Sequence, residues 1–303
     1  MTMRLINFTI LIPLLASCCK EPDDNCKPPE KIVEIKITDL LPDYLNSFEQ
    51  LELRSVSIRF YSPDGTTVIN KKITGNNGSF SMPYGKYSVL IFSSDFYELD
   101  GVLYRGEKAI QTYEAYSRQY TEGGNLFVNE PDPLFYAYVE KFVIDQSFEL
   151  LPVKLTPLVF TYRFKIWVEG INLLTGASAT VGGMYTSAFL KDGSHRIAEV
   201  ASMRVPVTKV VTKATEGYLQ GEFRSFGSHQ SSDIKHKITL ILSNGTTKVV
   251  ELDDLTNEIK SLPRGGEIPI KQKIVIKADS GNGNNEYNPG VNPWDDIEII
   301  LPI

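Results

Sequence analysis

The sequence is poor in the residues that most often carry catalysis, metal binding or disulfide frameworks. Its 303 residues include 3 cysteines, 3 histidines and 2 tryptophans. So few cysteines cannot build a disulfide-rich scaffold, so the core must be stabilised by packing. A membrane-spanning helix needs about 20 apolar residues, and the longest apolar run, residues 5–15, is shorter and is interrupted by polar residues. We therefore expect neither a disulfide scaffold nor a transmembrane helix.

Positive charge is also scarce. Lysine and arginine number 31 against 37 aspartates and glutamates, which gives a net charge of −6 and a pI near 5.3. Nucleic-acid-binding domains usually carry a basic surface, so nucleic acid is not an expected partner. The hydrophobic content of 42% suffices for a packed core and excludes disorder as the main state.

The N-terminus has the pattern of a secretion signal that ends in a lipid-attachment site. Arg4 precedes the apolar run, and small residues follow it, as a signal peptidase requires. The sequence Leu-Ala-Ser-Cys at residues 15–18 resembles a bacterial lipobox, whose cysteine is alkylated with diacylglycerol before cleavage on its N-terminal side. The alternative is an ordinary secretion signal with a cysteine nearby. We predict a signal peptide at residues 1–17 and a lipid on Cys18, with acyl chains that hold the protein at the outer membrane.

A linker follows the predicted anchor. Residues 18–30 contain several prolines, which favour an extended tether. Residues 20–24, a lysine followed by clustered acids, are similar to the surface-export signal of Bacteroidales lipoproteins, and a solvated acidic tether explains them equally well. Cys19 and Cys26 either form a small disulfide or stay single. We expect the anchored protein to face the cell exterior.

Beyond residue 30 the chain alternates short apolar runs with turn dipeptides, and scarcely any stretch has a helical period. Apolar and polar residues alternate over residues 55–60, as in a strand buried on one face. We expect its apolar residues to face inward (Val56, Ile58 and Phe60) and its polar residues to face water (Ser55, Ser57 and Arg59). The strands are expected at residues 32–38, 54–61, 67–73, 87–93, 158–169, 182–191, 237–243, 246–252, 271–277 and 296–301. Residues 205–226 are expected to form either a pair of strands or one strand with a bulge at Gly217. This pattern predicts an all-β protein with two sandwiches in tandem, at residues 31–153 and 154–303.

Several segments between or after these strands have a predicted role. The dipeptide Asn244-Gly245 predicts a two-residue hairpin turn. Residues 253–262 are expected to form one short helix, stopped by a proline, and residues 40–50 either a short helix or an irregular crossover. Residues 94–125 are expected to form a decorated loop with a strand inside, the preferred place for binding. The C-terminal run, residues 297–303, is expected to pair within its own domain rather than be donated to another subunit.

No motif in the sequence supports a catalytic or metal site. The histidines lie in polar or loop surroundings, at spacings that match no common metal signature: His195, His229 and His236. Residues 279–286 suggest a calcium loop, but the third and fifth positions are glycine, so a polar loop explains them better. The acidic pairs 253–254 and 295–296 precede or open predicted elements, where capping and solvation are ordinary uses. We expect a noncatalytic protein without metal or cofactor.

Aromatic residues leave a glycan-binding surface open as an alternative. Trp167 lies between two apolar residues inside a predicted strand, and we expect it in the core. Trp294 follows Asn292-Pro293 in a predicted loop, either with its ring in solvent or as an anchor for the loop. Four tyrosines form a looser group that fits a half-buried β surface: Tyr104, Tyr113, Tyr116 and Tyr120.

Three segments and the lipobox resemble a known family. The segments are Arg-Phe-Tyr-Ser-Pro-Asp-Gly at residues 59–65, Met-Pro-Tyr-Gly-Lys-Tyr-Ser-Val-Leu-Ile-Phe at 82–92 and Glu-Pro-Asp-Pro-Leu-Phe-Tyr-Ala at 130–137. Together they resemble uncharacterised Bacteroides lipoproteins, which are similar in turn to the fimbrillin-anchor lipoproteins of Bacteroidales, the anchor subunits of minor and major fimbriae. The similarity spans most of the mature chain.

The resemblance implies two transthyretin-like Greek-key β-sandwiches, a lipidated base and a noncatalytic role that joins a fimbrial shaft to the outer membrane. Pilins of this class polymerise when a protease removes a first strand and a neighbour's strand fills the groove. No convincing arginine processing site is found here, which fits an anchor or tip subunit that binds a fimbrial shaft subunit by strand complementation. The alternative is a surface glycan-binding lipoprotein of a polysaccharide-uptake system, which predicts several coplanar exposed aromatic rings.

Overall fold

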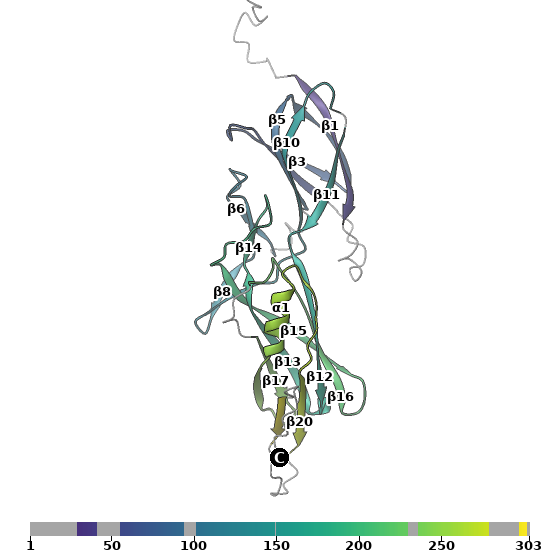
Figure 1. Ribbon diagram of the computed structural model, residues 1–303, viewed down its shortest axis with the longest axis vertical. Helices are drawn as coiled ribbons and strands as arrows, with labels where there is room; N and C mark the ends of the chain where they lie inside the picture. Colours follow the sequence, from purple (N-terminus) through teal and green to yellow (C-terminus); the bar gives the residue numbers. More distant parts are fainter. Residues whose placement is uncertain are drawn as a thin grey trace, which may run out of the picture.

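The computed structural model describes residues 29–40, 55–93, 101–148, 150–229, 236–278 and 297–301. The molecule is elongated, with two sheet-based bodies stacked end to end along its long axis (Figure 1). Almost all regular structure in the described residues is β. The predicted all-β fold of two transthyretin-like sandwiches in tandem is confirmed.

The N-terminal sandwich is a seven-stranded sheet that folds over its own core. Its strands are β1 (Glu30–Leu40), β2 (Ser55–Tyr61), β3 (Val68–Thr74), β4 (Asn77–Pro83), β5 (Gly85–Ser93), β10 (Phe135–Ile144) and β11 (Leu150–Pro157), in the order β3-β2-β5-β10-β11-β1-β4. Strand β1 pairs antiparallel with β4 and parallel with β11. Strands β10 and β11 pair at only two positions, so the sheet divides there into two layers. Val56, Ile58 and Phe60 lie inside, as their alternation predicts.

The C-terminal sandwich is built on a longer sheet. Its main strands are β12 (Phe160–Glu169), β13 (Leu174–Tyr185), β15 (Val200–Val211), β16 (Glu216–Ser225), β17 (Lys237–Leu242), β18 (Thr247–Glu251), β20 (Lys273–Ala278) and β21 (Ile297–Leu301), in the order β18-β17-β13-β15-β16-β12-β20-β21, with β19 (Gly266–Ile268) beside β12. The predicted hairpin at Asn244-Gly245 is confirmed between β17 and β18. Gly245 has φ +82°, a left-handed conformation that glycine adopts without a steric cost.

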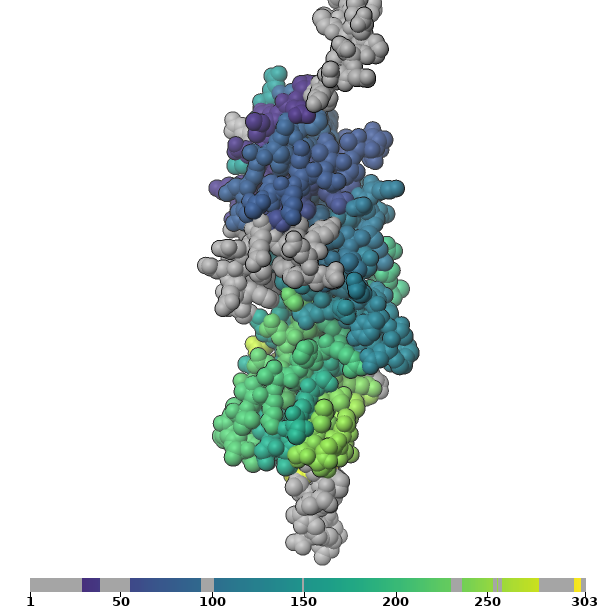
Figure 2. Space-filling model, turned by 180° about the vertical axis from the view of Figure 1, so that it is seen from behind, coloured from purple at the N-terminus to yellow at the C-terminus, as the bar shows by residue number. Residues whose placement is uncertain are grey.

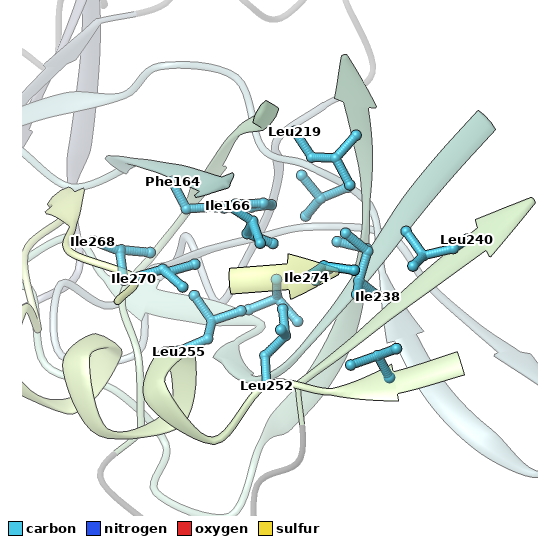
Figure 3. Packing of buried hydrophobic residues seen from close by; sticks show 14 of the residues in the cluster. Phe164, Ile166, Leu219, Ile238, Leu240, Leu252, Leu255, Ile268, Ile270 and Ile274 are labelled. Carbon is cyan, nitrogen blue, oxygen red and sulfur yellow. The ribbon is translucent and has the colours of Figure 1, made fainter. Parts of the chain in front are cut away.

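The core of the C-terminal sandwich is mainly aliphatic. The predicted helix is confirmed as α1 (Asp253–Ser261), and its Leu255 and Ile259 are buried against the sheet. Figure 3 shows Leu252 and Leu255 pointing toward Ile270 and Ile274. Phe164 packs over Gly221, where a Cβ atom would lie 2.2 Å from the ring. This core therefore depends on close contact between sheet and helix.

The segment predicted as a decorated loop joins the two sandwiches. It contains β6 (Leu103–Arg105), β7 (Glu114–Tyr116), β8 (Gln119–Glu122) and β9 (Asn125–Val128). Strands β6 and β7 form a small sheet with β14 (Ser187–Phe189) from the second half of the chain, and β9 pairs with β15. Figure 2 shows this blue-to-teal insertion beside the green second sandwich. The loop prediction is therefore wrong in extent, because three strands lie within residues 94–125 rather than one, and a fourth begins at residue 125.

A third hydrophobic cluster fills the junction between the sandwiches. It combines Tyr61 and Phe92 of the first sheet with Tyr113 of the insertion and Phe226 of the second half. Residues 158–159, between β11 and β12, are buried in the same cluster. Because one core includes residues of both sandwiches, the junction is packed rather than linked by an exposed tether. The division of the chain at residues 153–154 stays a prediction.

Candidate functional site

The predicted lipid anchor lies outside the described residues. This applies to the signal peptide at 1–17, to Cys18, and to Cys19 and Cys26 in the linker. Only the last two residues of that linker are described, and the second of them opens β1. Within the described ranges, no helix has the length and apolar character to cross a bilayer. The lipid-attachment site therefore stays a prediction.

A buried carboxylate holds three segments together at the junction. Glu114 is fully buried, and it accepts hydrogen bonds from Arg105 Nε at 2.7 Å and Arg196 Nε at 3.1 Å. The Ser187 hydroxyl donates a further bond. Burial favours the neutral acid, but these bonds outweigh burial and hold the pKa of Glu114 below its ordinary value. Glu199 pairs with the outer side of Arg105, so the cluster is charge-balanced and fits a structural clamp.

The outward face of β2 is covered by the insertion. The guanidinium of Arg59 lies 4.5 Å from the ring centroid of Tyr113 and donates a hydrogen bond to Glu107 at 3.0 Å. Ser55 is buried, and Ser57 and Arg59 are half-buried. The prediction that these three residues face water is therefore wrong, and for Arg59 the cause is the insertion, which an alternation pattern does not reveal.

The four predicted tyrosines do not form one exposed surface. Tyr113 is fully buried in the junction, while Tyr104 and Tyr116 are half-buried. Tyr120 is 37% exposed on β8 and stacks on Phe127. The half-buried interpretation is confirmed for Tyr104 and Tyr116, and these tyrosines provide no coplanar platform for a glycan.

Trp167 is exposed, so its predicted place in the core is wrong. Both chain neighbours of Trp167 are buried, whereas its own side chain is 53% exposed on the outer face of β12. Its ring meets Tyr218 of β16 edge to face, with centroids 5.6 Å apart and planes at 70°. Rings at this angle do not form a flat sugar platform. Residues two positions apart in a strand share a face, and Lys165 and Glu169, two positions from Trp167 on either side, are charged. This is the signal in the sequence that indicates an exposed face.

The C-terminal strand pairs within its own domain, as predicted. Strand β21 is parallel to β20, from Ile274 opposite Ile297 to Ala278 opposite Leu301. Among the described strands β21 pairs only with β20, so its other edge is free of described partners. Ile300 is 59% exposed on the same face as Trp167. We call Trp167, Ile300 and the edge of β21 the distal surface.

The histidines occupy two separate places. His236 is buried, its Nδ1 accepts the Gly182 N–H at 3.2 Å, and burial lowers its pKa to about 4. His236 lies outside any strand, one residue before β17, as the prediction of polar or loop surroundings allows, but it is buried. His195 stacks on Tyr185 at 4.1 Å, and His229 meets the same ring edge to face. In the described ranges no three His, Cys, Asp or Glu side chains gather as a metal site would require.

The predicted acidic features have ordinary places where they are described. Asp253 and Asp254 are the first residues of α1, and the residue at the N-cap is Leu252. Negative charge near a helix N-terminus is favourable there. Residues 279–286, the acidic pair 295–296 and Trp294 lie outside the described residues.

A cavity of about 340 Å³ opens where the two sandwiches meet. Its walls come from four segments: β10, the crossing from β11 to β12, the loop before β15 and the turn after α1. We call it the junction cavity, and its polar and aromatic side chains are Tyr136, Thr156, Phe160, Asp192, His195 and Arg264. Sequence reasoning missed it because these residues are far apart in the chain.

A more open groove of about 730 Å³ lies on the outer face of the second sheet. Small side chains such as Thr180, Ser202 and Thr239 form its floor, and Phe127 of the insertion borders it. Arg204, at its edge, already pairs with Glu122 of β8. The guanidinium of Arg204 at this edge of the groove is therefore already neutralised by a carboxylate.

Comparison with known proteins gives a family and a fold. A family model described as a domain of unknown function, DUF5119, matches residues 40–205. No curated protein matches the sequence. The matched segment runs through the insertion and across the junction into β15.

Three solved structures are similar to this chain. A candidate adhesin from Bacteroides ovatus has a TM-score of 0.61 at 17% identity, over 96% of this chain and 99% of that one. A candidate polysaccharide-binding protein (DUF1812) from Bacteroides thetaiotaomicron has a TM-score of 0.53 at 12% identity, over 78% and 89%. The fimbrial anchor protein Mfa2 from Porphyromonas gingivalis has a TM-score of 0.44 at 11% identity, over 79% and 88%. The expected resemblance to Bacteroidales adhesion proteins is confirmed at the level of fold.

Proposed function

We propose that this chain, which belongs to the DUF5119 family, is a noncatalytic outer-membrane lipoprotein that acts at the cell surface as a fimbrial anchor, assembly or adhesion subunit. The observation that carries the proposal is the superposition with the Bacteroides ovatus candidate adhesin along nearly the whole of both chains. Matching of both sandwiches and their order supports a shared role more strongly than one matching sandwich would.

The arrangement of the sandwiches fits an anchored base. Strand β1 begins at one end of the long axis, and β21 lies near the other (Figure 1). A lipid on Cys18 would hold the first sandwich near the membrane and present the second away from it. The distal surface then faces outward.

The N-terminal sheet also supports the role of a base. Strand β1 lies between β4 and β11, and its Val33, Ile35 and Ile37 are buried. Because the chain fills this position with its own strand, the first sandwich leaves no groove between β4 and β11 for a neighbour's strand. One assembly surface is then idle, as expected of a subunit at the end of a fimbria.

The distal surface is the proposed contact with a fimbrial shaft subunit. A free strand edge accepts a partner strand by main-chain hydrogen bonds, and nearby exposed apolar side chains add specificity. Ile300 on β21 provides such a side chain, and Trp167 lies on the same face of the sheet two strands away, on β12. The alternative role, glycan binding by a polysaccharide-uptake system, predicted coplanar exposed rings, and the 70° angle between Trp167 and Tyr218 does not provide them.

The anchor is tested by mass spectrometry of the mature N-terminus. Cys18→Ala should abolish acylation and lipobox-dependent cleavage, while the matched variant Cys19→Ala should remain acylated at residue 18. An unmodified wild-type chain that begins elsewhere contradicts the lipid anchor. Protease treatment of intact cells should release the sandwiches, and protection that is lost only on lysis places the protein on the periplasmic face.

The partner contact is tested by co-purification from an envelope fraction. We expect a fimbrial subunit to co-purify with the wild type and to be lost with Trp167→Ala combined with Ile300→Asp. Ile241→Asp is the control, because Ile241 is 46% exposed on β17, away from the distal surface. Equal recovery with all three proteins contradicts the distal surface as the contact.

A further inference from the structure

The junction cavity combines hydrogen-bonding groups from both sandwiches in one partly enclosed space. Its volume of about 340 Å³ is at the lower end of the range for small-ligand pockets, which commonly lie between domains. Tyr136 and Thr156 come from the first sheet, and Phe160 from the second. The kind of ligand that this cavity can bind depends on the side chains that its loops place in the lining.

The loop before β15 keeps the cavity open and supplies a carboxylate. Gly193 has φ +70°, and a Cβ atom there would lie 2.8 Å from the Tyr136 hydroxyl. Asp192 Oδ1 accepts bonds from the Ser194 amide at 2.9 Å and the Ser194 hydroxyl at 2.6 Å, which fix the loop. The other oxygen of Asp192 accepts no bond from a described residue and is available to a ligand.

The turn after α1 supplies a guanidinium on the opposite side. Tyr162 donates a hydrogen bond from its hydroxyl to the Pro263 carbonyl at 3.3 Å, which holds the turn in place. The next residue, Arg264, forms no ion pair or hydrogen bond with the described residues and is exposed. Burial raises the pKa of Tyr136, and Asp192 adds to the rise while Arg264 opposes it. Both charges therefore lie near the same phenol.

His195 adds a neutral imidazole. Burial lowers its pKa, so the ring is uncharged at neutral pH. Nδ1 lies 3.1 Å from the Ser187 carbonyl and donates its proton to that oxygen, which leaves Nε2 as an acceptor. The stacking on Tyr185 fixes the ring orientation. The imidazole is thus held in one tautomer and one orientation.

This combination selects a class of ligand. One carboxylate and one guanidinium leave the lining without net charge, whereas phosphate or another anion favours an excess of donors and positive charge. A purely apolar ligand would displace water from the phenol, the imidazole and the charged groups of the lining without replacing its hydrogen bonds, at a cost. Hydroxyl groups both donate and accept, and the apolar face of a sugar ring packs on aromatic rings such as Phe160. The geometry points to the junction cavity as a binding site for one neutral sugar residue, the terminal unit of a glycan chain.

The inference does not depend on fimbrial assembly, because the cavity and the distal surface share no residue. The experiment uses the detergent-solubilised, full-length mature protein on a microarray of neutral and acidic glycans, followed by calorimetric titration with the strongest ligand. We expect a glycan with a neutral terminal sugar to bind. Arg264→Gln and Tyr136→Phe should each weaken binding by about tenfold or more, since each removes hydrogen bonds to the ligand.

The control is Lys213→Gln, at an exposed ion pair of the second sandwich far from the cavity, which should bind as the wild type does. Unchanged melting temperatures of the Arg264 and Tyr136 variants keep a loss of binding separate from unfolding. The inference is wrong if no neutral glycan binds, if only acidic glycans bind, or if binding survives both cavity variants. Loss of glycan binding with Trp167→Ala alone would place the glycan site on the distal surface instead. Co-purification of Arg264→Gln with a fimbrial subunit should be unchanged, which separates glycan binding from the assembly role.

Discussion

The core of the C-terminal sandwich and the junction between the sandwiches are both buried, but they are stabilised differently. The sandwich core consists mostly of Ile, Leu and Val, brought together by strands and α1. The junction combines several aromatic rings with the Glu114 clamp. Apolar burial is roughly proportional to area and has no direction, whereas rings and ion pairs require particular angles. The first therefore stabilises one body, and the second fixes the relative orientation of two.

The largest expected effect is in the sandwich core. Phe164→Ala removes a fully buried ring that packs on Gly221, and we expect about 3–5 kcal/mol of destabilisation from lost burial and the cavity left behind. Trp167→Ala is the matched control, three residues along the same strand and more than half exposed. In chemical denaturation, Trp167→Ala should lower the free energy of unfolding far less than Phe164→Ala does. Equal costs for both variants contradict the assignment of the two faces of β12.

A smaller effect is expected at the junction. Glu114→Gln removes the buried carboxylate of Arg105 and Arg196 and leaves them only Glu199. We expect about 2–3 kcal/mol of destabilisation, limited because both arginines are partly exposed to water. The two sandwiches should then unfold in separate steps, measured by calorimetry. The control is Glu216→Gln, whose ion pair with Lys213 is exposed. A single transition that moves without splitting means that the clamp does not orient the sandwiches.

The most gradual difference is in pH dependence, since at any one pH above 4 only part of the effect is lost. His236 has a folded pKa of about 4, below its ordinary value of 6.5, so the unfolded chain takes up the proton first. Stability of the second sandwich is therefore lost as pH falls from about 6.5 to about 4, by roughly 2–3 kcal/mol. The pKa of Glu114 is also lowered, so its contribution is present above about 4.5 and is lost only at lower pH.

Acid should therefore weaken the second sandwich before the junction. Thermal melting between pH 7 and pH 4 tests this order, and His236→Asn should flatten the loss in that range. If the variant and the wild type lose stability in parallel, His236 does not control it.

Local patterns in the sequence predicted local structure well. The Asn244-Gly245 turn, α1 and the inward face of β2 follow from residues adjacent in the chain, and the structure confirms each. Of the two alternatives for residues 205–226, the structure confirms the pair of strands, which is the hairpin of β15 and β16. The strand β4 was missed because Asn77 and Gly78 have the composition of a turn, whereas the turn lies one residue earlier.

Features that depend on distant segments were not predictable in this way. Nothing near Arg59 in the sequence indicates Tyr113, which covers it from 54 residues away. Trp167 has apolar neighbours, yet its own face is solvated because no layer of the described residues covers its ring on that side of β12. The junction cavity likewise combines residues from four separate segments. Such sites arise from packing between elements, which a single sequence does not encode locally.

The pairing of β1 has a mechanical consequence. This strand runs along the long axis of the molecule from its N-terminal end (Figure 1), and it is bonded on one side to β4 and on the other to β11. Tension applied at residue 29 along that axis loads both rows of hydrogen bonds in shear, so many bonds must break together. Tension applied across the sheet would open them one at a time. A body held by its N-terminus and pulled from the opposite end thus meets the load in its stronger direction.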